Sequence, residues 1–261
     1  MEQILAGGKT MKTGLCSVTF RALAAEKAAE LAVKAGLDCI EWGGDVHVPP
    51  DKPETARKVA KLCRDLNLET PSYGSYYRLD GGDFDSVSKT AEILGARDIR
   101  VWAGTKDAEL FSRDEYFKLV ENVKNIAQIA RKRGQNVCFE YHYGTYCNSA
   151  ENTLKLIEDA GENNVFTYWQ PMYWLHGKTA DEQSENLSSI KILGGLIKNV
   201  HVYNWRGHER LPLIDAIDEW KNYAACLSAE NYFLEFVQGD LQDAFFKDAS
   251  SLVALKRDLM R

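Results

Sequence analysis

Two glutamates lie inside apolar stretches of this sequence, where a carboxylate is unusual. Glu140 belongs to the run 136–141, and Glu235 belongs to the run 232–236. An unpaired buried carboxylate costs several kcal/mol, so each glutamate needs a divalent metal or a buried Lys or Arg as its partner. Neither run contains a basic residue, which favours the metal; a structural salt bridge is the alternative interpretation.

Gln170 and His201 are further polar residues at the ends of apolar runs. Ligation by oxygen atoms and one imidazole suits Mn²⁺, Mg²⁺, Co²⁺ or Zn²⁺. Such a metal would polarise a substrate carbonyl, and two carboxylates on opposite sides of the substrate could then remove a proton and return it. The residue types therefore predict proton abstraction at the carbon next to a carbonyl.

The elements that must position these residues are short apolar runs that alternate with longer amphipathic ones. We expect buried parallel strands over residues 14–19, 38–42, 69–73, 98–102, 136–141, 165–169, 199–203 and 232–236. We expect helices over residues 24–34, 55–66, 86–94, 114–133, 151–160, 181–193, 214–227 and 241–259.

Eight such units in 261 residues correspond to about 33 residues per unit, the span of one strand-and-helix crossover. This predicts an α/β fold, a single-domain (β/α)8 TIM barrel over residues 13–261, with residues 1–12 as an N-terminal extension. An open doubly wound sheet is disfavoured because no glycine-rich phosphate loop follows the first strand. In such a barrel, residues at the carboxyl ends of the strands share one mouth.

Composition limits the class of protein. The chain is 45% hydrophobic and 27% charged with a net charge of -6, which is typical of a soluble globular protein and disfavours binding to nucleic acid. No stretch approaches the roughly 20 apolar residues of a membrane span, and the start does not resemble a signal peptide, so we expect a cytoplasmic protein. The six cysteines are scattered without a C-x-x-C pair, which predicts reduced, mostly buried thiols.

Several segments together resemble the xylose-isomerase-like TIM barrel superfamily of sugar phosphate isomerases and epimerases. They are LDCIEWGGDVHVP (37–49), VCFEYHYGT (137–145), YWQP (168–171), NVHVYNW (199–205), RLPL (210–213) and YFLEFV (232–237). The resemblance implies four metal ligands at the ends of strands five to eight, Glu140, Gln170, His201 and Glu235. It also implies that the two glutamates form the acid/base pair.

The sequence departs from the family pattern at the sixth strand. The family commonly has Asp there with His three residues later, whereas this chain has Gln170 and then Tyr173. His176 could substitute for that histidine, at a different offset. Because an amide oxygen brings no charge, we expect weaker metal binding than in a site with three carboxylates.

Five residues are candidate substrate contacts: His47, His142, Arg206, Trp102 and Tyr73. His47 follows a Gly-Gly turn, and His142 lies two residues beyond Glu140, on the same side of an extended strand. Arg206 could bind an anionic group, and aromatic side chains at a barrel mouth suit the apolar face of a sugar ring. Surface or core packing is the alternative for each of them, and Glu41 is either buried or part of the mouth.

The leading hypothesis is a metal-dependent sugar isomerase or epimerase that moves a proton next to a carbonyl through an enediolate. One alternative is an endonuclease-like phosphodiesterase, which needs more metal ligands than the five histidines of this chain favour. The others are lyase or deglycosylation chemistry on an oxidised sugar and a non-catalytic sugar-binding barrel, which Gln170 would suit. The expected binding partner is a small carbohydrate, and we expect the protein to bind neither nucleic acid nor a membrane. The sequence does not decide whether the chain forms a homo-oligomer.

Overall fold

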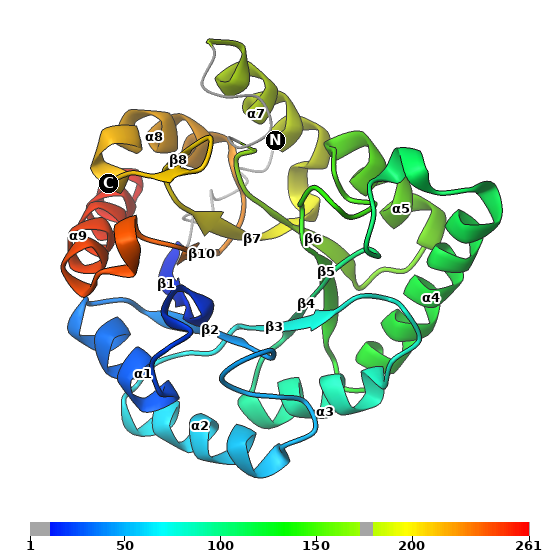
Figure 1. The fold of residues 1–261 in the computed structure, drawn as a ribbon, viewed down its shortest axis with the longest axis horizontal. Helices are drawn as coiled ribbons and strands as arrows, with labels where there is room; N and C mark the ends of the chain where they lie inside the picture. Colours follow the sequence, from blue (N-terminus) through cyan, green and yellow to red (C-terminus); the bar gives the residue numbers. More distant parts are fainter. Residues whose placement is uncertain (1–10, 173–179, 261) are drawn as a thin grey trace, which may run out of the picture.

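The computed structural model describes residues 11–172 and 180–260, and eight parallel strands close into a barrel (Figure 1). The strands follow one another around the ring in the order β1-β10-β7-β6-β5-β4-β3-β2. They are β1 (Lys12–Cys16), β2 (Cys39–Gly43), β3 (Ser72–Tyr77), β4 (Asp98–Val101), β5 (Asn136–Phe139), β6 (Val165–Trp169), β7 (Ile197–Val202) and β10 (Asn231–Leu234). The predicted fold class is confirmed.

Helices surround the barrel (Figure 1). They are α1 (Ala25–Lys34), α2 (Pro53–Asp65), α3 (Phe84–Leu94), α4 (Arg113–Arg131), α5 (Ala150–Ala160), α7 (Ala180–Leu193), α8 (Ile217–Cys226) and α9 (Gln242–Leu259). Of the helices in the described part of the chain, none is both long and apolar enough to cross a membrane.

Local sequence signals set several helix boundaries. Ser112 begins α4 with a capping box, in which its hydroxyl accepts a hydrogen bond from the Glu115 backbone N–H and the Glu115 carboxylate accepts from the Ser112 N–H. Ser149 caps α5 in the same way through its hydroxyl, and Gly161 ends that helix with a φ of 64°, which favours glycine. These boundaries lie within two residues of the predicted ones.

Several local features differ from the expectation. The strand predicted over 14–19 ends at Cys16, and a 3-10 helix follows over Ser17–Phe20. The third strand begins at Ser72 because Pro71, which has no N–H to donate, separates it from an isolated bridge at Glu69. The predicted helix 214–227 is divided into a 3-10 helix at Leu213–Ala216 and then α8. A short antiparallel pair, β8 (Trp205–Arg206) and β9 (Glu209–Arg210), follows β7 and was not expected.

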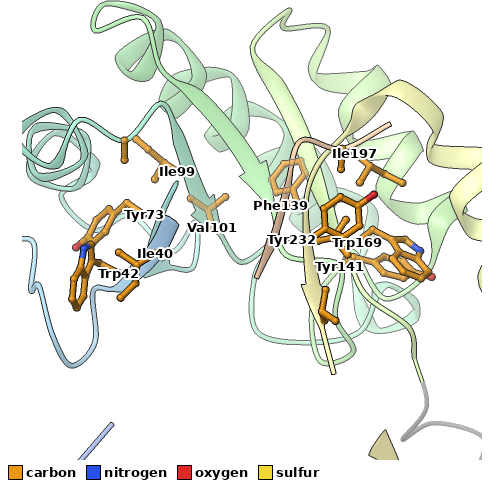
Figure 2. Close-up of a cluster of buried hydrophobic side chains, with 14 of the residues drawn as sticks. Ile40, Trp42, Tyr73, Ile99, Val101, Phe139, Tyr141, Trp169, Ile197 and Tyr232 are labelled. Atoms are coloured by element: carbon orange, nitrogen blue, oxygen red, sulfur yellow. The ribbon is translucent and has the colours of Figure 1, made fainter. Parts of the chain in front are cut away.

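The main hydrophobic core lies between the strands and the helices. Figure 2 shows part of it, with Ile40 and Trp42 of β2 close to Tyr73 of β3. Alternation along each strand turns the other set of side chains into the barrel. Cys16, Cys39, Cys138, Tyr168 and Phe233 of that inner set form a small apolar cluster together with Val18, which follows β1, and buried polar residues lie on either side of the cluster along the barrel axis.

The cysteines are unpaired thiols, as predicted. Cys16, Cys39, Cys63, Cys138 and Cys147 are buried, and Cys226 is exposed. At the amino end of the barrel, β1 begins at Lys12, and the preceding Met11 packs into the core.

Candidate active site

Three of the four predicted ligands converge on one atom of the fourth, Nδ1 of His201. That nitrogen lies 3.1 Å from Gln170 Oε1, 3.3 Å from Glu235 Oε2 and 3.6 Å from Glu140 Oε1. All four side chains are buried, with Glu235 the most accessible at 7%. The structure therefore brings the two glutamates together on one side of a single imidazole.

The strand register explains this convergence. His201 pairs with Phe233 across β7 and β10, and Glu235 follows two residues later, so that both polar side chains point into the barrel. On β5, Glu140 follows Cys138 by two residues and also points inward. Each glutamate stands just after its strand, where its backbone N–H still bonds to the neighbouring strand, at Val101 O for Glu140 and Val202 O for Glu235.

A buried arginine also occupies the site, and the sequence interpretation missed it. Arg100 on β4 is 1% exposed and forms an ion pair with Glu140, while its Nη2 lies 3.0 Å from Glu41 Oε1. Glu140 thus has a buried basic partner on the neighbouring strand, and the expectation that no basic residue compensates it is wrong. The signal was present, because Arg100 interrupts an apolar strand that pairs with β5, and its partner in the register is Cys138.

Electrostatics in the cluster keep Glu41 ionised. Burial is the largest influence and opposes the charge on Glu41, but the Arg100 guanidinium, His201 and the hydrogen bond from Tyr168 together outweigh it and hold the pKa of Glu41 below its ordinary value. Burial also opposes the charge on Arg100, but Glu41 together with Tyr76, Cys16 and Glu235 outweighs it, so that the pKa of Arg100 is raised. Burial, together with Glu41 and Glu235, raises the pKa of the neighbouring Cys16 thiol.

The cluster fits a divalent cation in charge and in donor chemistry. With a neutral imidazole, Glu41, Glu140 and Glu235 bring three negative charges and Arg100 brings one positive charge. Ligand atoms about 2.0–2.2 Å from a small cation lie roughly 3–3.5 Å from one another, which is close to the separations around His201 Nδ1. Cys16 is an additional candidate ligand, because its sulfur lies within 4.8 Å of ligand atoms of His201 and Glu235.

A cavity of about 210 Å³ opens above the cluster, and Glu140, Gln170, Glu235 and Arg100 form part of its wall. Two predicted substrate contacts, His142 and Trp102, also line it and pack together with ring centroids 4.8 Å apart. Burial lowers the pKa of His142, which favours a neutral imidazole there.

Aromatic residues supply the rest of the cavity wall. Tyr76 stacks on Trp102 on one side, and Trp205 packs against Phe236 on another. Tyr76 and Phe236 have φ values of 58° and 56°, a left-handed backbone that is costly for bulky side chains. Such strain is concentrated at functional sites, and neither residue was singled out from the sequence.

Three predicted contacts do not reach the cavity. His47 is buried, with Nδ1 3.0 Å from Ser17 Oγ and Nε2 3.1 Å from Leu23 O. Tyr73 lies in the outer core and donates its hydroxyl to Val48 O at 2.7 Å (Figure 2). Arg206, on β8, forms an ion pair with Glu219 of α8, with 2.9 Å between Nη2 and Oε1.

These three residues are not retained as substrate contacts. Tyr173 and His176 lie outside the described residues. The prediction that His176 replaces the missing family histidine therefore stays a prediction.

The chain belongs to the xylose isomerase-like TIM barrel family, whose model matches residues 29–234. A 3-dehydroshikimate dehydratase of Bacillus anthracis is 24% identical over 167 residues, which cover 59% of this chain and 60% of that protein. The aligned part thus spans less than two thirds of that relative.

Solved structures share the fold. A probable 3-DHS dehydratase of Bacillus anthracis has a TM-score of 0.74 at 18% identity, covering 93% of this chain and 99% of that one. A D-psicose 3-epimerase in the presence of D-fructose has a TM-score of 0.70 at 16% identity, covering 96% and 100%. A xylose isomerase-like barrel of Mycobacterium smegmatis in complex with magnesium has a TM-score of 0.70 at 12% identity, covering 97% and 98%.

Proposed function

We propose that this protein is a metal-dependent enzyme that moves a proton at the carbon next to a carbonyl in a small polyhydroxylated substrate, as a sugar isomerase or epimerase does. The observation that carries the proposal is the pair of carboxylates, Glu140 and Glu235, which face the same nitrogen of His201 at 3.6 Å and 3.3 Å. The magnesium-containing relative and the epimerase of the same fold support it.

In this proposal Glu140, Gln170, His201 and Glu235 hold the divalent metal, which polarises the substrate carbonyl when bound. One glutamate takes the proton from the carbon beside that carbonyl, and a carboxyl group returns it to the neighbouring carbon or to the other face. Because Gln170 brings no charge, the metal is held by two carboxylates and two neutral ligands.

The remaining cavity residues orient the substrate. Trp102, Trp205 and Phe236 offer apolar faces to the C–H bonds of a ring, while His142 and the Arg100 guanidinium offer polar contacts. The cavity is small and lined by aromatic groups, which suits one sugar-sized molecule better than a nucleic acid strand. Among the described residues, the group that could hold a metal contains one imidazole, that of His201, which also argues against the multi-metal site of a phosphodiesterase.

A second candidate is a lyase that begins with the same proton abstraction and then loses a β-hydroxyl as water. The two dehydratase matches favour it. So does the asymmetry of the glutamates, because Arg100 pairs with Glu140, whereas the contacts of Glu235 are with His201 and Cys16. One free base is enough for elimination, while epimerisation needs a proton donor on each face.

Proton exchange with solvent tests the proposal. The protein with Mn²⁺ or Mg²⁺ is incubated in D₂O with a panel of ketoses and with 3-dehydroshikimate, and deuterium at the carbon beside the carbonyl is followed by NMR. We expect Glu235→Gln and Glu140→Gln each to lower the rate by about 10²–10⁴-fold, the usual contribution of a general acid or base. The exposed Glu158→Gln is the matched control and should exchange at the wild-type rate.

The products separate the two candidates. An isomer or epimer of the starting sugar supports the first reaction, and loss of water with a new double bond supports the lyase. Wild-type exchange rates in both glutamate variants, or no exchange with any compound in the panel, would contradict the proposal.

A further inference from the structure

Glu41 is a buried carboxylate that lies behind the proposed metal ligands. It stands on β2, is 0% exposed and is not part of the cavity wall. Neither the proton transfer nor the ligand set proposed above uses it. An ionised group in such a place needs a structural or functional reason, because its burial is costly.

Three hydrogen-bond donors and one guanidinium surround the Glu41 carboxylate. Its Oε1 lies 3.0 Å from Arg100 Nη2 and accepts from the Cys16 thiol at 3.2 Å. Its Oε2 accepts from Ser72 Oγ at 3.1 Å and from the Tyr168 hydroxyl. The carboxylate is therefore held in one orientation by groups from four other strands.

The remaining neighbour of Glu41 is His201, whose ring separates it from the other glutamates. His201 Nε2 lies 3.5 Å from Glu41 Oε1, and Nδ1 faces the three other proposed ligands. His201 is 0% exposed, and its Nε2 has no hydrogen-bond partner among the described residues, so that the contact with Glu41 Oε1 is a close approach of a buried, unsatisfied nitrogen to a carboxylate oxygen. Glu41 Oε1 is thus the acceptor at hand for a proton on Nε2.

The two nitrogens of an imidazole have linked roles. A neutral histidine that ligates a metal through Nδ1 must carry its proton on Nε2, and an acceptor at Nε2 fixes both that tautomer and the plane of the ring. Carboxylates commonly do this for metal-binding histidines, and their loss typically costs 10–100-fold in metal affinity.

We infer that Glu41 is a positioning residue for the proposed metal centre. It accepts the Nε2–H of His201 and so turns the Nδ1 lone pair toward Gln170 and Glu235. Through Arg100 it also holds one oxygen of Glu140, leaving the other oxygen, Oε1, on the side of His201. This inference rests on the metal site of the proposed function, although it requires no particular substrate.

Metal affinity is the first test, with Glu41→Gln as the variant and Ser72→Ala as the matched control. Glu41→Gln keeps the shape and removes the charge, whereas Ser72→Ala removes one donor to Glu41 and leaves its contact with His201. Titration calorimetry with Mg²⁺ and Mn²⁺ should give a dissociation constant about 10–100-fold higher for Glu41→Gln. The constant for Ser72→Ala should stay within about threefold of the wild type.

The second test begins with the wild-type protein. In Mg²⁺-loaded protein labelled with ¹⁵N-histidine, the His201 ring should show a proton on Nε2, shifted downfield by its carboxylate acceptor, and no proton on Nδ1. The same proton in Glu41→Gln should move upfield and exchange faster with solvent. A proton on Nδ1, or an Nε2 that carries none, would overturn the inference even if Glu41→Gln failed to fold.

The outcomes also separate this inference from the proposed function. Unchanged metal affinity in Glu41→Gln would overturn the positioning role alone. A wild-type protein that binds neither Mg²⁺ nor Mn²⁺ would overturn both proposals. Tight metal binding with the expected loss in Glu41→Gln, but no proton exchange on any sugar, would support the positioning role and count against the proposed reaction.

Discussion

The two ends of the barrel interior both hold buried polar residues, but they pair them differently. At the amino end, Asp98 accepts hydrogen bonds from Asn136 Nδ2 at 2.8 Å and Asn199 Nδ2 at 2.9 Å. Asn231 Nδ2 completes the group by donating to Asn199 Oδ1 at 2.8 Å. One carboxylate is thus surrounded by neutral amides that bond to it and to one another.

The carboxyl end concentrates charge instead. Glu41, Glu140 and Glu235 gather around one guanidinium and one imidazole, and the donors Arg100 Nε and His201 Nε2 lack a hydrogen bond in the described part of the protein. An incompletely paired cluster of charges costs stability, and natural proteins keep such clusters where function requires them. This difference is the one we expect if the amino end stabilises the barrel and the carboxyl end carries the proposed chemistry.

The largest expected effect is on the free energy of unfolding, and it is seen by comparing a substitution at the amino end with one at the carboxyl end. Asn199→Ala leaves Asp98 Oδ2 and Asn231 Nδ2 without partners, so we expect a loss of about 2–4 kcal/mol in the free energy of unfolding. Glu235→Gln removes a charge from the crowded end and should change that free energy of the metal-free protein by less than about 1 kcal/mol. Urea denaturation measures both.

For metal affinity we expect the opposite ranking, with the larger loss in Glu235→Gln. Glu235→Gln is expected to weaken Mn²⁺ binding at least about tenfold, because a charged ligand is lost, whereas Asn199→Ala should leave it unchanged. If both variants lost stability and affinity to the same extent, the division between the two ends would be wrong.

A smaller effect is expected at Gln170, the neutral member of the charged end. Gln170→Glu keeps the length of the side chain and converts its ligand oxygen into a charged one. We expect Mg²⁺ and Mn²⁺ to bind about tenfold more tightly, since metal affinity rises with ligand charge. Gln170→Met, of similar volume but without the oxygen, is the control and should bind more weakly than wild type. Calorimetry that ranks the three proteins in another order would exclude Gln170 as a ligand.

The fold followed from the sequence because its signal is repeated. Eight apolar runs with helical segments between them specify a barrel even where a boundary moves, as it does at Ser72. The convergence of Glu140 and Glu235 followed as well, because residues just after parallel strands of one barrel must meet at its mouth. Neither inference depends on the conformation of a single side chain.

Other features depend on side-chain directions that a sequence does not give. The strand of each glutamate contains no basic residue, and Arg100 reaches Glu140 from the adjacent strand, a contact that depends on the strand register. Tyr73 and Trp102 look alike as aromatic residues near strand ends, yet Tyr73 points into the helix layer and Trp102 lines the cavity. Alternation along a strand predicts which side chains face the barrel interior, but only when the bounds and register of the strand are known, and those of β3 differ from the predicted ones.

The smallest expected effect is a pH dependence at the amino end. Burial raises the pKa of Asp98, although hydrogen bonds from Asn136 and Asn199 oppose the shift. Because the folded-state pKa lies above the unfolded one, the unfolded chain loses its proton first, and the stability contributed at this position falls as pH rises above about 4. Asp98→Asn cannot ionise, so its stability relative to the wild type should increase over that pH range.

The exposed Asp83 supplies a control of opposite sign. Hydrogen bonds from the hydroxyl and the backbone N–H of Ser86 lower the pKa of Asp83 at the start of α3. Its contribution to stability is present above the unfolded pKa and is lost as pH falls, so Asp83→Asn should become less stable relative to wild type as pH rises. Urea denaturation between about pH 3.5 and 7 measures how the free energy of unfolding of each variant, relative to the wild type, changes with pH. If this difference did not change with pH for Asp98→Asn, burial would not raise the pKa of Asp98, and the prediction would be wrong.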